Sequence, residues 1–324
     1  MLGVGCWMAA ALLLAAAETK PAPAPEAFRK LIGEYGSDRK ILYILERDGA
    51  LTVLIKPDYY PLTPAGGVKY RYSRGTLSFR LDGAGKPIEL NLDGTAFPRR
   101  AIGPESGNVF RIQPRRPIDR IRREAQSQQP PAEKAPNRKA DLVDLTTLDP
   151  AIKLDIRHAG TDNFLSTPLY TSARAFLQRP AAEALARAHR KLMAQGYGLL
   201  IHDAYRPWYV TKIFWDATPD DKHIFVANPA EGSRHNRGCA VDLSLYDLRS
   251  GKPIEMVGVY DEMSDRSYPD YPGGTSLERW HRALLRRAME AEGFTVFETE
   301  WWHFDYKDWR EYGIGNIPFE RIPK

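Results

Sequence analysis

A polar segment between residues 115 and 140 divides the chain and limits what the whole of it can fold into. It reads RRPIDRIRREAQSQQPPAEKAPNRKA, so proline, glutamine, lysine and arginine dominate and apolar side chains are few. Such a segment does not bury enough apolar surface to offset the conformational entropy lost on ordering. We therefore predict a solvated linker, with at most a short helix over residues 118–126, and a folded block on either side. Contact of its basic start with an anionic polymer is the alternative.

The block before the linker, residues 25–114, has the pattern of short antiparallel strands. Apolar runs at residues 41–45 and 51–55 flank Asp48-Gly49, and Asp-Gly between two such runs is a strong hairpin signal. Further turn pairs follow at Gly66-Gly67, Asp82-Gly83 and Asp93-Gly94. The spacing predicts a small antiparallel all-β domain. It holds no cluster of residues that suggests chemistry, so we expect a structural or docking module.

The block after the linker, residues 141–324, alternates helix and strand signals. Pro180 opens a helical pattern that Gly196 closes, and an apolar strand pattern follows at residues 197–202. Thr275 and Glu278 have the spacing of a capping box before a second helix, which is followed by a strand at residues 294–297. We therefore expect an α+β domain here.

The first 24 residues have the pattern of an export signal. The apolar run from Met8 to Ala17 is too short to span a bilayer, and residues 15–17 offer a small-residue cleavage site. No lysine or arginine precedes the run, so an uncleaved apolar tail is the alternative. We expect an exported, periplasmic protein with no stable membrane span after cleavage. Export would leave Cys239 as the single cysteine, without a disulfide partner.

Composition excludes several classes of protein. Hydrophobic residues make up 43% and charged residues 27% of the chain, which rules out a disordered chain and a polytopic membrane protein. The net charge of +5 is spread along the sequence, so we expect no nucleic-acid partner. Two cysteines are too few for a disulfide scaffold, and no CxxC zinc motif is present.

The stretch SRHNRGCAVD, residues 233–242, holds the first candidate metal ligands. His235 offers a nitrogen donor and Asp242 a hard anionic oxygen, which together are two of the three protein ligands of a catalytic zinc. Their separation of seven would place them on opposite faces of a straight strand, so a bend is required, and Gly238 permits one. Spacing alone leaves open a loop histidine and a surface aspartate.

Two further stretches add chemistry. Near the C-terminus the chain reads EWWHF, where His303 suits a third ligand and Glu300 a general base inside an aromatic wall that excludes water. An aromatic core with a hydrogen-bonded histidine is the alternative. Arg206 follows a predicted buried strand, from which it can bind a carboxylate or an oxyanion, or pair structurally with Asp203. His202 and Asp203 fit a structural role. His189 and His281 lie beside arginines in predicted helices, so we expect both to be exposed.

The order DAYRP, SxHxxGxAxD and EWWH closely resembles the D-alanyl-D-alanine dipeptidase family of zinc peptidases, over about residues 141–309. The resemblance implies the small α+β fold shared with zinc D,D-carboxypeptidases, a hedgehog/D,D-peptidase-like catalytic domain. The all-β domain before it is an addition to that single-domain plan. It loosely resembles β accessory domains of some secreted peptidases, and we expect it to contact peptidoglycan.

The resemblance also implies a role for each matching residue. His235, Asp242 and His303 match the ligands of one zinc ion, and Glu300 matches the general base and acid. Arg206 matches the arginine that stabilises the oxyanion. The substrate-binding residues are Ser233, which matches one that lines the pocket, and Asp261, which matches more loosely an acid near the substrate ammonium. We read Cys239, at an unconstrained motif position, as a packing residue.

The function implied is zinc-dependent hydrolysis of the dipeptide D-alanyl-D-alanine to free D-alanine, by water that zinc activates and Glu300 deprotonates. Two alternatives stay open. A zinc D,D- or L,D-carboxypeptidase that trims peptidoglycan stem peptides would use the same residues, and a closed pocket around the ammonium, formed by residues 208–232 and Asp261, would distinguish the dipeptidase. A non-catalytic cell-wall binding protein would lack a ligand or the base, and none is missing.

Overall fold

A computed structural model describes residues 19–101 and 111–323. We call the first range the β block and the second range the second block. Residues 1–18 of the predicted signal, residues 1–24, lie outside the described residues, and its apolar run and cleavage site fall within this part. Within the described ranges, no helix has both the length and the apolar character needed to cross a membrane.

The β block consists of two antiparallel sheets and one short helix, α1 (Glu26–Arg29). The first sheet has the order β1-β2-β3-β4 and the second β5-β6-β7-β8-β9. The strands are β1 (Gly33–Ser37), β2 (Lys40–Arg47), β3 (Ala50–Ile55), β4 (Asp58–Pro61), β5 (Thr63–Pro64), β6 (Lys69–Tyr72), β7 (Gly75–Leu81), β8 (Pro87–Leu92) and β9 (Thr95–Pro98). Asp48 and Gly49, with φ of 53° and 81°, form the predicted hairpin turn between β2 and β3. Side chains from both sheets share one apolar core.

The second block is a mixed structure of helices and a mainly antiparallel five-stranded sheet, with the order β11-β13-β14-β16-β15. Only β11 and β13 pair in parallel. The sheet strands are β11 (Lys153–Leu154), β13 (Tyr197–Asp203), β14 (Ala240–Asp247), β15 (Phe294–Phe297) and β16 (Glu300–Tyr306), and a small separate sheet pairs β10 (Leu142–Asp144) with β12 (Phe176–Gln178). β13 and β14 are buried along nearly their whole length, as expected for central strands covered on both faces.

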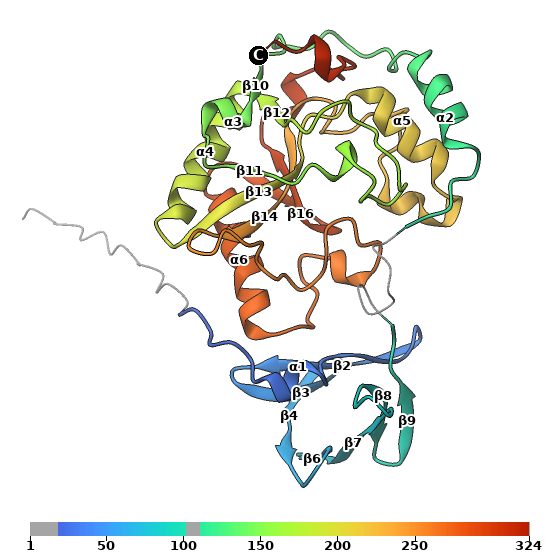
Figure 1. Ribbon diagram of the computed structural model, residues 1–324, viewed down its shortest axis with the longest axis vertical. Helices are drawn as coiled ribbons and strands as arrows, with labels where there is room; N and C mark the ends of the chain where they lie inside the picture. Colours follow the sequence, from blue (N-terminus) through green and yellow to red (C-terminus); the bar gives the residue numbers. More distant parts are fainter. Residues whose placement is uncertain (1–18, 102–110, 324) are drawn as a thin grey trace, which may run out of the picture.

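The helices cover the five-stranded sheet, as Figure 1 shows. They are α2 (Ile118–Gln126), α3 (Leu145–Leu148), α4 (Arg179–Met193), α5 (Trp208–Ala217) and α6 (Ser276–Glu290). α4 and α6 pack against each other and against the sheet, and α5 packs against α2. The predicted capping box begins α6, because Thr275 Oγ1 accepts from Glu278 N–H while Glu278 Oε2 accepts from Thr275 N–H.

The prediction of a solvated linker is wrong for residues 118–126. This segment forms α2, whose Ile121 and Ala125 are fully buried in the core of the second block. Composition pointed to a linker because arginines are frequent in the helix, yet two apolar side chains at i and i+4 are enough to dock it on α5. The polypeptide that joins the blocks therefore contributes to the fold of the second one.

Candidate active site

Three predicted ligands meet on the sheet. Asp242 of β14 and His303 of β16 are direct cross-strand partners, so their side chains leave the same face side by side. His235 precedes β14 in a turn that Gly238 closes at φ 67°, and this turn brings the imidazole back over the strand. His235 Nε2 lies 3.2 Å from Asp242 Oδ1 and 3.1 Å from His303 Nδ1, and His303 Nδ1 lies 3.0 Å from Asp242 Oδ1.

The outer nitrogens of both imidazoles have partners that only accept. His235 Nδ1 lies 2.6 Å from the carbonyl oxygen of Ala204, and His303 Nε2 lies 3.0 Å from Asp305 Oδ1. These outer nitrogens therefore carry protons, and the inner nitrogens of the neutral rings present lone pairs. The two nitrogen lone pairs and the carboxylate oxygen of Asp242 then face one another. These three electron-rich groups repel one another unless a positive charge lies between them.

A metal ion satisfies this donor set. Asp242 Oδ1 is buried, and its close neighbours are the inner nitrogens of His235 and His303, so this oxygen has no hydrogen-bond donor while both rings are neutral, as the coordinating oxygen of a ligand would be. Burial disfavours a charge on His303, yet Asp305 and Asp242 outweigh it and raise the pKa of the imidazole to about 10, so a proton on this ring supplies the positive charge when no metal ion does. Two nitrogens and one carboxylate oxygen suit zinc, and tetrahedral ligands at zinc bond lengths are about 3.4 Å apart, close to the spacing here.

Glu300 begins β16, and its Oε2 lies 3.7 Å from His303 Nδ1. Burial is the main cause that raises the pKa of this carboxyl to about 7, and the negative charge of Asp242 acts in the same direction. A carboxyl group with a pKa near neutrality accepts and returns protons readily at that pH. Its position beside the ligands therefore suits a general base.

Arg206 follows β13, and Asp203 at the end of that strand fixes its guanidinium. Nε and Nη2 of Arg206 donate to Asp203 Oδ2 at 2.9 and 2.6 Å, and Nη2 lies 3.8 Å from Asp242 Oδ2. Tyr170 Oη donates to the other oxygen of Asp203 at 2.6 Å. Asp203 is also the cross-strand neighbour of Asp242, which in turn pairs with His303. One row across β13, β14 and β16 therefore sets the position of both ligands and, through Asp203, of the arginine.

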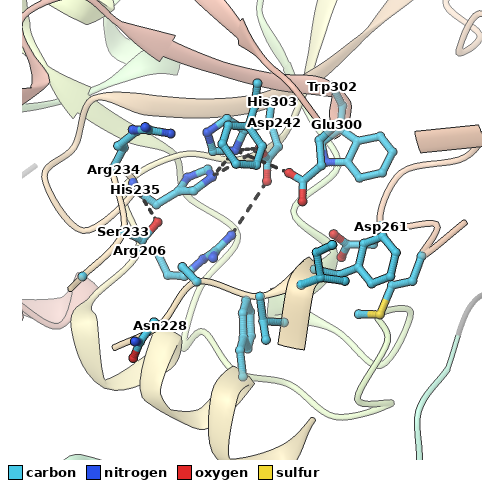
Figure 2. A pocket seen from close by; sticks show the side chains of 18 of the residues that line it. Arg206, Asn228, Ser233, Arg234, His235, Asp242, Asp261, Glu300, Trp302 and His303 are labelled. Carbon is cyan, nitrogen blue, oxygen red and sulfur yellow. Dashed lines mark hydrogen bonds and ion pairs between the residues drawn. The ribbon is translucent and has the colours of Figure 1, made fainter. Parts of the chain in front are cut away.

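A cavity of about 370 Å³ is lined by the three predicted ligands together with Glu300 and Arg206 (Figure 2). Asp261 and Ser233 line it too, and in this view they lie on opposite sides of Arg206. Asp261 Oδ2 is buried without a hydrogen-bond partner, and burial raises the pKa of this carboxyl well above its usual range. Ser233 Oγ accepts from His235 N–H at 3.2 Å, so it also supports the ligand turn. Part of the predicted wall, residues 224–228 and 231–232, lines the cavity as well.

Sequence reasoning missed two residues that contact the ligands. Tyr260 Oη donates to Asp242 Oδ2 at 3.3 Å and lies 3.1 Å from His158 Nε2. Asp305 accepts from His303 and pairs with Arg234 at 2.9 Å. Asp305 could have been found by strand alternation, because it stands two residues after His303 and so shares its face. No local pattern marks Tyr260.

The prediction that His189 and His281 are exposed is wrong. His189 is fully buried with Nδ1 2.9 Å from Asp149, and His281 is 6% exposed with Nε2 3.1 Å from Tyr197 Oη. His189 stands four residues after Leu185 and His281 four after Leu277, so both fall on the apolar helix faces despite their arginine neighbours. Cys239 is buried in the core, as predicted.

Comparison with known proteins assigns the second block. A family model described as D-ala-D-ala dipeptidase matches residues 138–313, more than half of the chain and every residue of the cluster above. A D-alanyl-D-alanine dipeptidase of Escherichia coli (strain K12) is 34% identical over 174 residues, 54% of this chain and 89% of that protein. One of Enterococcus faecium is 34% identical over 175 residues, 48% and 87% of the two chains. One of Streptomyces coelicolor is 32% identical over 186 residues, 52% and 92%. The family match excludes the β block.

Proposed function

The chain belongs to the D-Ala-D-Ala dipeptidase family of metallopeptidases, and from that premise we propose that it hydrolyses D-alanyl-D-alanine to D-alanine with one zinc ion. His235, Asp242 and His303 would hold the ion. The observation that carries this proposal is the convergence of two imidazole lone pairs on an unpartnered oxygen of Asp242, which calls for a cation. The fold of the second block would then be that of the zinc D,D-peptidases.

The roles of the chain's own residues follow from their positions. When bound, zinc supplies Lewis-acid activation of water and of the scissile carbonyl. Glu300 takes the proton from the attacking water and returns it to the leaving amine. The guanidinium of Arg206, held by Asp203, faces the negative charge that develops on the carbonyl oxygen. This division of work needs no nucleophilic serine or cysteine.

The pocket supports a small zwitterionic substrate. Asp261 Oδ2 has no hydrogen-bond partner and lies 3.8 Å from His158 Nε2, and the free ammonium of a dipeptide would supply a donor and favour the ionised form of this carboxyl. Ser233 lies across the cavity from it. A volume of about 370 Å³ is near the small end of ligand sites, which span about 300–1,000 Å³. A peptidoglycan stem peptide carries no free ammonium next to the scissile bond, so Asp261 favours the dipeptide over the stem.

The cellular setting is part of the same proposal. The apolar run near the N-terminus supports export to the periplasm, where cell-wall fragments would supply the substrate, and the β block would contact peptidoglycan. Fractionation of cells that carry the tagged full chain tests export, and co-sedimentation of the purified protein with insoluble peptidoglycan tests the contact. Recovery in the cytoplasm would contradict export, and a lack of co-sedimentation would contradict the contact with peptidoglycan. Neither result would affect the proposed reaction.

Hydrolysis by the zinc-loaded protein, residues 25–324, decides the substrate. D-Ala-D-Ala and a peptidoglycan pentapeptide are compared at equal concentration, and released D-alanine is measured. Release from the dipeptide alone supports the proposal. Release from the pentapeptide instead would make the protein a carboxypeptidase that uses the same residues, and release from neither would refute both.

A pair of variants separates the base from the ligands. Glu300→Ala should keep zinc and lose turnover by about 10²–10⁴-fold, the usual contribution of a general base. His303→Ala should lose both zinc and turnover. Zinc content by elemental analysis accompanies each assay, and full activity of Glu300→Ala would contradict the mechanism.

A further inference from the structure

Strand β2 of the β block is buried on both of its faces. Five consecutive residues, Leu42 to Glu46, are buried, whereas a strand with one solvated face alternates. Leu42 and Ile44 face the core of the β block. Tyr43 and Leu45 face the other way and form a separate apolar cluster with Val257 and Tyr271 of the second block. The β block therefore docks on the second block through an apolar contact.

The docking site is the chain that leads into α6, residues 257–275, which we call the pocket segment. In Figure 1 this chain lies between the β block and the sheet of the second block. Val257 anchors its start in the apolar cluster. Near its end, Tyr271 Oη donates to Glu34 Oε1 at 2.9 Å, and the carbonyl of Gly274 accepts from Glu46 N–H at 3.1 Å. Residues 268–274 do not line the cavity.

Buried carboxylates of the β block hold the end of this segment. Glu46 Oε2 accepts from Ser276 N–H at 2.7 Å, and Arg279 Nη2 donates to the carbonyl of Glu46 at 2.6 Å. Glu34 and Glu46 are 3% and 2% exposed, and they are the only buried carboxylates of the β block as described. Hydrogen bonds to buried charged groups are the strong ones, so these contacts fix the segment firmly.

The middle of the pocket segment reaches the active site. Asp261, Glu262 and Met263 line the cavity, and Tyr260 donates to the ligand Asp242. Glu262 closes the turn, since its carboxylate accepts from Val259 N–H at 3.1 Å and from Ser264 Oγ at 2.8 Å. Asp261 has a φ of 59°, a left-handed conformation that costs free energy and persists only when its surroundings enforce it. Both ends of the segment that enforces it rest on the β block.

We propose that the β block positions Asp261 for the substrate's ammonium by holding both ends of the pocket segment. Glu46 and Tyr271 are the positioning residues, and they act through the segment without touching the substrate. The identity of the ammonium as ligand rests on the proposed function, whereas the mechanical role of the β block does not. The extra block thus sets the affinity for the amino end of the substrate, whereas the three residues that would hold the metal lie outside the pocket segment, on β14, on β16 and in the turn before β14.

Two variants of different severity test the proposal in the zinc-loaded protein. Glu46→Ala removes the acceptor for Ser276, and Tyr271→Phe removes only the hydroxyl that binds Glu34. We expect the KM for D-Ala-D-Ala to rise by about tenfold and about threefold respectively, the effect of roughly one hydrogen bond or less. The kcat and the zinc affinity should stay within about twofold. Arg80→Ala, on the exposed Arg80–Glu89 pair of β7 and β8, is the matched control and should change nothing.

Hydrogen exchange without substrate gives a readout that does not depend on activity. Backbone amides of residues 257–268 should exchange faster in Glu46→Ala and Tyr271→Phe, while those of β14 and β16 keep their protection. Unchanged exchange and unchanged KM in both folded variants would overturn the proposal. Faster exchange in a protein that does not hydrolyse the dipeptide would support the positioning and refute the dipeptidase assignment.

A double-mutant cycle identifies the residue through which the β block acts. Asp261→Asn removes the carboxylate charge, so adding Glu46→Ala to it should raise KM no further. A combined KM that is the product of the two single effects would overturn the link to Asp261. Thermal unfolding of each variant confirms that the proteins compared are folded.

Discussion

The two blocks are both built on antiparallel sheets, yet they use burial differently. The β block as described buries few polar side chains, and its two buried carboxylates, Glu34 and Glu46, bond across the interface. The second block buries a row of ionisable groups on the central strands of its sheet and in the turns next to them. These are Asp203, Arg206, His235, Asp242, His303 and Asp305.

The difference teaches where to look for chemistry in a chain like this. A buried charge destabilises a fold unless it is paired, so it persists where a function or a specific contact requires it. In the second block the charges surround the cavity, and in the β block they mark the docking face. If this comparison holds, substitutions of the six buried residues just named should affect turnover or metal binding. Substitutions of the same kind on the surface of the β block should not.

Among the substitutions that test this comparison, Arg206→Ala should have the largest effect. Arg206→Ala should lower kcat by about 10²–10³-fold with zinc retained, because one oxyanion donor is lost. It should also lower the free energy of unfolding by about 3–5 kcal/mol, since Asp203 is left as a buried charge without its cation. Steady-state kinetics and urea unfolding measure the two effects. Arg80→Ala in the β block is the control, and an equal loss in that variant would break the comparison.

The next effect concerns metal affinity. Asp305 orients His303 through a hydrogen bond to the nitrogen that faces away from the centre, as carboxylates behind zinc-bound histidines do. Asp305→Asn should therefore weaken zinc binding by about 10–100-fold. Competition with a chelator of known affinity gives the value. Asp308→Asn, on the exposed Arg138–Asp308 pair nearby, is the matched control. Equal zinc affinities in the Asp305 variant and the native chain would mean that the bond only packs the strand.

The acid sensitivity of the fold should also lie in the second block, because all seven histidines of the chain follow residue 157. Burial, with a smaller contribution from the charge of Lys20, lowers the pKa of His281 to about 4. Below pH 6.5 the unfolded chain binds a proton that the folded chain refuses. The free energy of unfolding should therefore decrease as the pH is lowered from 6.5 to 4, by about 1.4 kcal/mol per pH unit for this group.

The change in slope on substitution tests this assignment. His281→Gln should remove about one proton from the pH dependence of urea unfolding between pH 6.5 and 4.5. The same slope in the native chain and in His281→Gln would show that His281 titrates alike in the folded and unfolded states.

Local signals explain what could be predicted of the fold. The Asp-Gly hairpin at residues 48–49 and the capping box of α6 depend on contacts within a few residues, so the sequence carries them directly. The bend at Gly238 was predictable because two residues of opposite parity had to share one site. The helix over 118–126 was expected, but its burial depends on α5, far along the chain.

The active site likewise contains residues that local motifs predict and residues that only distant contacts bring into place. His235, Asp242, Glu300 and His303 carry motifs, and the structure brings them together. Tyr260 and the docking of Glu46 on Ser276 depend on pairings between residues 18 and 230 apart in sequence, and no local pattern records such a pairing. The family resemblance could not supply the docking contact either, because the match excludes the β block.

The smallest effect expected is that of Cys239, which sharpens the comparison within one strand. Cys239, Val241 and Leu243 belong to the apolar core, whereas Asp242 between them faces the cavity. Burial raises the pKa of this thiol to about 12, so the reactive thiolate is scarce at neutral pH. In a Cys6→Ser background, a thiol reagent should therefore label the folded protein only as fast as it unfolds. Cys239→Ala should keep turnover within about twofold and cost about 1 kcal/mol of stability. Rapid labelling of the folded protein with loss of activity would instead place the thiol at the pocket. The alternation of side chains around β14 would then not distinguish residues that pack in the core from residues that face the cavity.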